Sequence, residues 1–99
     1  MPFVHIVLVK IKNSESLESL KAEAQTFEKK EEIKNLAEHV TWGPPVYTDR
    51  AKGFDYGLYS VFKDKAKYEE YRDLPYHKEW ISSKVVPNVE DIIAYDFEY

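Results

Sequence analysis

The segment from Phe3 to Ile11 is apolar on both of its alternating faces. Valine and isoleucine fill much of it, which is typical of a β-strand. The two faces are Phe3, His5, Val7, Val9 and Ile11 and, opposite them, Val4, Ile6, Leu8 and Lys10. A strand that is apolar on both sides lies between two packed layers. The fold must therefore supply one layer for each side of the sheet that contains this strand.

Hydrophobic spacing and turn residues divide the rest of the chain. The first predicted helix begins at about residue 14 and carries Leu17, Leu20, Ala24 and Phe27 on one face. Further helices are predicted at 64–71 and 76–86, and further strands at 36–42, 54–62 and 89–99. The charged run 29–34 is predicted as a helix end and loop, and 46–53 as a loop. This order predicts one α+β domain over residues 1–99, a ferredoxin-like split β-α-β subunit with an antiparallel four-stranded sheet and helices on one face.

Helices on one face leave the other face of this sheet without a layer. The first strand is apolar on that face too, and the strand 54–62 carries aromatic side chains on both faces. An uncovered apolar face needs a partner. The simplest partner is a second copy of the chain placed face to face, which gives a closed, two-subunit barrel. The sequence therefore predicts a homodimer.

Composition excludes several classes of function. The net charge is −4 and lysines alternate with glutamates, so the basic stripe of a nucleic-acid-binding protein is absent. The chain has no cysteine, which excludes disulfides, thiolate catalysis and cysteine-ligated metals. The apolar run near the start is too short for a membrane span and lacks the pattern of a signal peptide. We expect a cytoplasmic protein without nucleic-acid or membrane partners.

Tyr71 and His77 stand six positions apart around Pro75, where one predicted helix ends and the next begins. A phenol and an imidazole at such a corner can share a cavity, and that pair suffices for proton transfer on a small oxygenated substrate. His77 would be the general base and Tyr71 a hydrogen-bond donor to a carbonyl. The structural alternative is that His77 caps or packs at a helix start and that Tyr71 is a core aromatic.

Further residues are predicted to line the same pocket, which we expect to be an apolar cavity enclosed between the sheet and the helices of each subunit. His5 and Tyr56 would supply polar groups, and the aromatic fraction of 15% suggests that Phe27 and Trp80 contribute apolar walls. His5 has the alternative of a hydrogen-bonded core histidine, and His39 is predicted at the surface. The three histidines lie far apart without ligand spacing, so we expect neither a metal nor another cofactor.

Four segments together resemble the stress-responsive A/B barrel (Dabb) family. They are His5–Lys10, Trp42-Gly43, Tyr71–His77 and Ala94–Phe97. The resemblance implies a dimeric α+β barrel. The plant olivetolic acid cyclase of this family closes a linear polyketide by aldol condensation without a cofactor. A tyrosine and a histidine carry its proton transfers, and they match Tyr71 and His77.

The resemblance also implies that His5 matches a histidine of the cyclase pocket. Tyr56 and Leu74 stand where the cyclase has further histidines. The leading hypothesis is a cofactor-free small-molecule enzyme or binder resembling polyketide cyclases, with a small aromatic or polyketide-like ligand. The alternatives are a non-catalytic stress-response dimeric barrel and a cofactor-free monooxygenase. Family membership implies fold more strongly than function.

Overall fold

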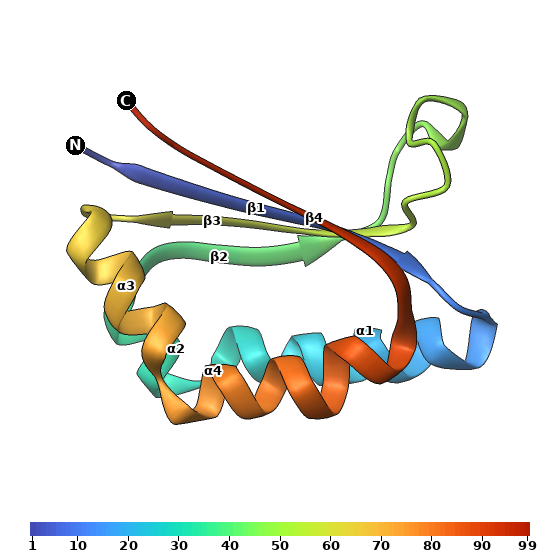
Figure 1. Cartoon of the computed structure of the whole chain (residues 1–99), viewed down its shortest axis with the longest axis horizontal. Helices are drawn as coiled ribbons and strands as arrows, with labels where there is room; N and C mark the ends of the chain where they lie inside the picture. Colours follow the sequence, from blue (N-terminus) through green and yellow to red (C-terminus); the bar gives the residue numbers. More distant parts are fainter.

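Four antiparallel strands form one sheet in the computed structural model, which describes all 99 residues (Figure 1). The strands are β1 (Phe3–Ile11), β2 (Ala37–Gly43), β3 (Tyr56–Phe62) and β4 (Val89–Glu98). The helices are α1 (Ser14–Lys29), α2 (Glu31–Leu36), α3 (Lys65–Asp73) and α4 (Pro75–Trp80). The strand order is β2-β3-β1-β4, so the first and last strands are neighbours. The α+β, ferredoxin-like topology predicted from the order of elements is confirmed.

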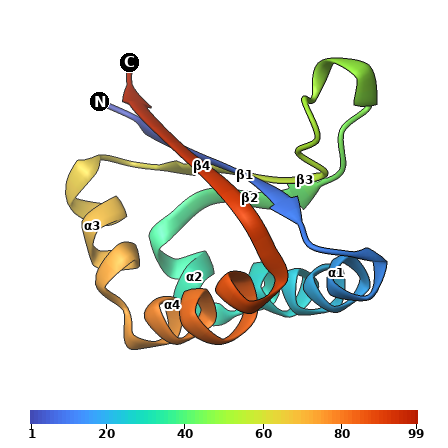
Figure 2. The ribbon, with the colours of Figure 1, turned by 45° about the vertical axis from the view of Figure 1, so that its right-hand side comes forward.

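The helices lie on one side of the sheet, and the core fills the space between the two layers (Figure 2). Alternate residues of the central strands face the helices and are buried. They are Phe3, His5, Val7, Val9 and Ile11 of β1 and Tyr56, Leu58, Ser60 and Phe62 of β3. α1 packs against them with Leu20, Ala24 and Phe27, which follow one another at helical spacing. Asn13 starts this helix, because its side-chain oxygen accepts the backbone N–H of Ser16 at 2.9 Å.

The opposite face of the sheet has no covering layer, and large apolar side chains remain partly exposed on it. They are Leu8 of β1, Tyr59 of β3, and Ile93, Tyr95 and Phe97 of β4. These residues lie on adjacent strands, since Leu8 pairs with Ile93 and Ile6 with Tyr95. In the fold, β1 is therefore apolar both on the face toward the helices and on the uncovered face. A contiguous apolar face of this kind marks an interaction surface.

The charged run after α1 is helical rather than a loop, so the prediction for residues 29–34 is wrong. Lys30 has an extended backbone (φ −65°, ψ 126°) that separates α1 from α2. Ile33 explains the second helix, because it is fully buried against the core while the charged residues around it face solvent. One apolar residue among charges gave too weak a periodic signal in the sequence.

The loop Pro44–Asp55 rises from the sheet on the side away from the helices (Figure 1). It confirms the predicted loop over 46–53, but β3 begins at Tyr56, two residues later than predicted. Asp55 ends the loop instead of starting the strand, because its carboxylate accepts the backbone N–H of Ile11 at 2.9 Å. Near the tip, Lys52 (φ 54°) and Gly53 (φ 86°) adopt left-handed backbone conformations that reverse the chain.

The predicted helix over 76–86 is present, but its geometry changes along its length. The α-helical part ends at Trp80, a wider turn with π-type hydrogen bonding covers Ile81–Val85, and a 3₁₀ turn covers Val86–Asn88. Pro87 lacks the N–H needed to continue the helix, which accounts for the end. Neither this helix nor any other has the length and apolar character needed to cross a membrane.

Candidate active site at the α3–α4 corner

A single residue, Leu74, separates α3 from α4 and forms the corner on which the candidate site is built. Its backbone is extended (φ −58°, ψ 132°), because a residue that precedes proline is disfavoured in the helical region. Pro75 then occupies the first turn of α4, where its missing N–H costs nothing. The break turns the chain so that residues on either side of it meet.

The corner brings the rings of Tyr71 and His77 together, with centroids 4.3 Å apart. Tyr71 is the last core residue of α3 and is only 1% exposed, whereas His77 is partly buried. Burial, with a smaller contribution from Tyr68, raises the pKa of the Tyr71 phenol far above its ordinary value. Tyr71 therefore keeps its proton at all physiological pH values and acts as a neutral hydrogen-bonding group.

His77 is held in one orientation by the end of the preceding helix. Its Nδ1 lies 3.1 Å from the backbone carbonyl oxygen of Arg72. A carbonyl only accepts hydrogen bonds, so Nδ1 is the donor and Nε2 carries the free lone pair. The same contact satisfies one of the terminal carbonyls of α3. Burial lowers the pKa of His77, the Arg72 carbonyl partly offsets this, and nearby His5 lowers it further. The neutral imidazole, which is the form that accepts a proton, is favoured at pH 7.

We expect His77 in the folded protein to titrate below the value of about 6.5 that is usual for histidine in an unfolded chain. Burial destabilises the charged ring, so the unfolded chain takes up this proton first as the pH falls. His77 therefore lowers the free energy of unfolding as the pH drops below about 6.5 and has no effect well above it. Ring carbon NMR shifts, measured with and without urea, test this. A folded-state pKa above the unfolded one would contradict it.

His5 joins this pair from the sheet. Its ring lies 4.9 Å from that of Tyr68 and 6.2 Å from that of Tyr71, measured between centroids. The hydroxyl of Ser60 donates to the His5 backbone carbonyl at 2.8 Å and fixes the strand there. The structure thus brings together the three residues His5, Tyr71 and His77.

Asp96 is a member of this cluster that the sequence reasoning missed. It faces His5 across the β1–β4 pair, and its carboxylate contacts His5 Nδ1 directly. Because a carboxylate accepts hydrogen bonds, Nδ1 of His5 carries the proton in this contact. Asp96 alternates with Ile92 and Ala94 along β4, so its face was predictable. Its partner was not, because the pairing depends on the register between the two ends of the chain.

Phe27 packs against Tyr71 and His77, and Trp80 packs against Phe27, so neither side chain lines an open space. Their ring centroids are 4.7 Å apart, and that of Phe27 is 6.2 Å from Tyr71. Phe27 is fully buried and Trp80 nearly so. We expected an apolar cavity between the sheet and the helices, but the principal pocket of the structure lies on the other face of the sheet. Next to the site, His77 borders a shallow surface groove of ≈ 440 Å³ with Arg72 and Ile81.

Tyr56 lies away from the other predicted site residues. It pairs with Val9, whereas Ser60 pairs with His5, which places Tyr56 about 13 Å farther along β3. Its ring stacks on Trp42, with centroids 5.6 Å apart. Burial and the nearby Glu28 carboxylate raise the pKa of Tyr56. Tyr56 therefore belongs to a separate aromatic pair at the far end of the core.

The remaining histidine, His39, is exposed on β2 as predicted, with its ring 5.4 Å from that of Tyr59. The structure contains no group of three or more histidine, cysteine, aspartate or glutamate side chains that could hold a metal ion. The side chains at the corner offer a neutral imidazole, a protonated phenol and a histidine–carboxylate pair.

Solved structures with the same fold include proteins from bacteria and plants. A Dabb family protein from Mesorhizobium loti superposes with a TM-score of 0.80 at 20% identity, covering 99% of this chain and 96% of that one. A dimeric ferredoxin-like protein of unknown function from Jannaschia superposes with 0.78 at 18% identity over 100% of both chains. The hydroxynitrile lyase from Passiflora edulis gives 0.74 at 19% identity, covering 97% and 91%.

At these identities the superpositions establish the fold alone. A search of the curated proteins finds no match. The model of one protein family, the Stress Responsive A/B Barrel Domain, matches residues 3–99. That match spans nearly the whole chain, from the start of β1 past the end of β4. The chain therefore belongs to the stress responsive A/B barrel (Dabb) family.

Proposed function

We propose that this protein is a homodimeric, cofactor-free enzyme that transfers protons on a small carbonyl compound at the α3–α4 corner. The observation that carries the proposal is the contact of Tyr71 with a His77 whose Nδ1 is anchored to the Arg72 carbonyl. That anchor leaves Nε2 free as a base beside a phenol that keeps its proton. One neighbour of the fold is a hydroxynitrile lyase, so a lyase has been built on this scaffold.

The reaction that these groups support best is an intramolecular aldol closure of a poly-β-keto chain. Nε2 of His77 removes a proton from the carbon next to a carbonyl, and the Tyr71 hydroxyl donates a hydrogen bond to the oxygen that gains charge. The resulting enolate carbon attacks a second carbonyl of the same molecule and forms the ring bond. The new alkoxide then takes the proton back from His77, which restores the neutral imidazole.

The position of His77 supports a route for the substrate. Its ring lies between buried Tyr71 and the groove of ≈ 440 Å³ at the surface. A chain that enters along this groove meets His77 before it meets Tyr71. The His5–Asp96 pair lies on the sheet, and His5, whose ring centroid is 6.2 Å from that of Tyr71, supports the placement of the phenol.

Synthetic linear poly-β-keto thioesters of graded length test this activity, with the carbocyclic product separated from spontaneous lactones by mass spectrometry. We expect His77→Ala to lower the rate by on the order of 10²-fold or more, the usual contribution of a general base. Tyr71→Phe keeps the packing but removes the donor and is expected to cost about 10-fold or more. His39→Ala, an exposed histidine, is the matched control. Unchanged turnover in His77→Ala would refute the role of base.

The homodimer in this proposal is supported by the uncovered apolar face of the sheet. Ile93, Tyr95 and Phe97 stay partly exposed there, which a lone soluble subunit rarely tolerates over so wide a face. The Jannaschia protein with the same fold is described as dimeric. A second copy placed on this face would bury both apolar surfaces by the same symmetric contact.

A non-catalytic stress-response barrel is the second candidate, and the burial of Tyr71 favours it. At 1% exposure the phenol is enclosed by Phe27, Phe62 and Tyr68. In that case Tyr71 and His77 stabilise the corner and the assembled barrel is the functional product. Tyr71→Phe separates the candidates, because it leaves packing unchanged. Loss of turnover with unchanged stability supports the enzyme, and the absence of any turnover in the wild type supports the structural role.

A further inference from the structure

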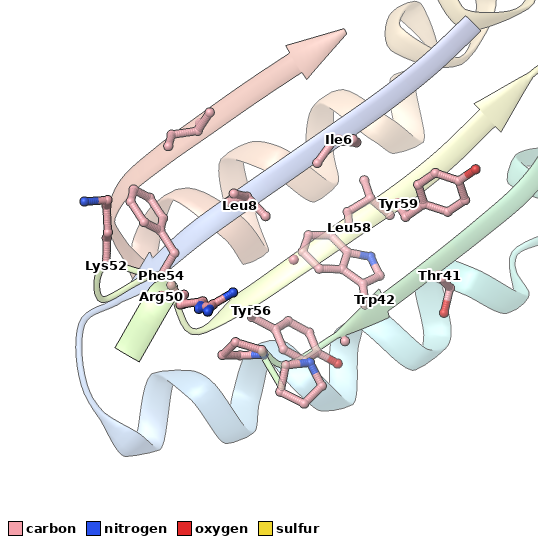
Figure 3. A pocket seen from close by; sticks show the side chains of 16 residues that line it. Ile6, Leu8, Thr41, Trp42, Arg50, Lys52, Phe54, Tyr56, Leu58 and Tyr59 are labelled. Atoms are coloured by element: carbon pink, nitrogen blue, oxygen red, sulfur yellow. The ribbon is translucent and has the colours of Figure 1, made fainter. Parts of the chain in front are cut away.

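The loop Pro44–Asp55 stands on the same side of the sheet as the uncovered apolar face (Figure 1). Between the loop and the sheet lies a groove of ≈ 710 Å³, the principal pocket of the structure. Ile6 and Leu8 line its floor, and Arg50 and Lys52 lie together at its loop end (Figure 3). A second copy of the chain packed on this face must therefore contact the loop and fill the groove.

The two charged side chains that line the groove are both cations without a partner in the subunit. Arg50 and Lys52 belong to no ion pair, and no aspartate or glutamate borders the groove. Interfaces place opposite charges against each other. The surface of the second copy that fills the groove must therefore present a carboxylate.

Asp91, in the first part of β4, is such a carboxylate. It lies on the uncovered face, because it is paired in register with Lys10, which follows Leu8 on the same face of β1. Lys10 does not neutralise it, since its ammonium nitrogen lies 5.0 Å from the centre of the Phe54 ring instead. Asp91 is exposed and belongs to no ion pair of the subunit.

The loop that carries the cations is fixed to the end of β1. The backbone N–H of Asp55 donates to the Val9 carbonyl at 3.0 Å, and its carboxylate accepts the N–H of Ile11 at 2.9 Å. Gly53 (φ 86°) lies so close to Lys10 that an added Cβ would be 3.1 Å from its Cε. A loop held in this way presents its cations in place before a partner binds, which reduces the entropic cost of association.

Asp91 and the loop lie at the same end of the sheet but on different strands. Asp91 is opposite Lys10, which follows Val9, and Val9 pairs with Tyr56, the first residue after the loop. The strand order β2-β3-β1-β4 separates β4 from the strands β2 and β3 that the loop joins. A twofold axis that runs parallel to the strands, between two sheets packed face to face, keeps these ends together and places each β4 over the partner's β2. This arrangement brings Asp91 of each copy to the loop of the other.

The other face-to-face arrangement, with the twofold axis across the strands, matches the charges less well. It brings the loop to the opposite end of the second sheet. There the register pairs Val4 of β1 with Val61 of β3 and with Phe97 of β4, so these strands are apolar on the uncovered face. Cations held against apolar side chains lose water without gaining a partner. Charge complementarity therefore favours the axis parallel to the strands.

We propose that the groove under the loop is a docking site for β4 of the second copy, in which Arg50 and Lys52 of one subunit pair with Asp91 of the other. This inference rests on the homodimer of the proposed function and goes beyond it, because it names the contacts that decide which strands meet. The twofold axis forms the contact twice, once at each loop, so each substitution acts twice in a dimer.

Charge reversal on either side of the contact is expected to weaken the dimer. Arg50→Glu places a second carboxylate beside Asp91, and Asp91→Arg places a third cation in the groove, so we expect each to raise the dissociation constant of the dimer about 10-fold or more. Analytical ultracentrifugation of the full-length protein over a dilution series measures this constant. Higher salt is expected to reduce the difference from wild type. Lys34→Glu reverses an exposed charge on α2 and should leave the constant unchanged.

Mixing the two variants tests whether the contact crosses the interface. In a heterodimer of Arg50→Glu with Asp91→Arg both contacts again join opposite charges, whereas each homodimer repeats a repulsive contact. We expect native mass spectrometry of an equimolar mixture to show more heterodimer than the roughly one half that random pairing gives. Random pairing, or an Arg50→Glu dimer as tight as wild type, would overturn the docking site and leave the homodimer standing. A monomeric wild type would overturn both, and none of these outcomes depends on turnover at His77.

Discussion

Phe27→Ala is expected to lower the free energy of unfolding by about 3–5 kcal/mol, the usual cost of removing a fully buried phenylalanine side chain. Phe27 has no exposed surface, and its ring contacts those of Tyr71, Tyr76 and Trp80. The loss comprises the transfer of the ring from the core and the cavity left among its neighbours. Because domains of this size are stable by only about 5–15 kcal/mol, the variant approaches the limit of folding.

Urea unfolding, monitored by tryptophan fluorescence, measures this effect, since the ring centroids of Trp80 and Phe27 are 4.7 Å apart. Tyr47→Ala is the control, because Tyr47 is an exposed aromatic on the loop and its removal should change the stability by no more than about 0.5 kcal/mol. Phe27→Leu refills part of the space and is expected to lie between the two. A loss below about 1 kcal/mol in Phe27→Ala would show that the interior next to Tyr71 is not closely packed.

Ile93→Lys is expected to convert the proposed dimer into a monomer. Ile93 lies on the uncovered face of the sheet, directly opposite Leu8, and is 42% exposed in the single subunit. In a dimer formed by this face, the substitution places a charge without a partner in a dry interface, on both copies at once. Burying an unpaired charge costs several kcal/mol per ion, which exceeds what the lost isoleucine contact alone contributes. Light scattering after size-exclusion chromatography measures the mass. We expect twice the protomer mass of 11.7 kDa for the wild type and the protomer mass alone for Ile93→Lys.

The neighbouring residue provides a matched control. Ile92 is 46% exposed, so it resembles Ile93 in type and exposure, but its side chain points to the other face of β4. Ile92→Lys should therefore leave the dimer intact. A wild-type protein that is monomeric, or a dimer that survives Ile93→Lys, would rule out this face as the interface. Far-ultraviolet circular dichroism of both variants excludes unfolding as the cause.

The strands were predictable because each carries β-branched and aromatic residues with a period of two, and the first strand also revealed that both sheet faces are apolar. The corner was predictable from Pro75, which breaks the helix between Tyr71 and His77. α2 was missed because Ile33 is its sole fully buried residue. The interior cavity was wrongly expected because the sequence gives no measure of how fully Phe27 and Trp80 fill the space around Tyr71.

Two parts of the sites depend on contacts that local patterns do not encode. The His5–Asp96 contact joins residues 91 positions apart and exists only through the register of β1 with β4. The pocket on the uncovered face depends on how the loop Pro44–Asp55 packs against the sheet. Residues 46–53 were predicted as a loop, but nothing in their spacing indicated that Arg50 and Lys52 would be brought over the sheet.

The pairing of β1 with β4 also determines the timing of folding during synthesis. Within this domain β1 leaves the ribosome before the other elements, yet one of its two neighbours in the sheet is Val89–Glu98, which emerges after all of them. Until those residues emerge, β1 has an open edge and cannot become a central strand. Such long-range pairing is slow, because the entropy of closing a long loop is lost before the contacts form. The nascent chain thus holds an apolar strand with one open edge until β4 has been made, the condition under which chains associate wrongly with one another.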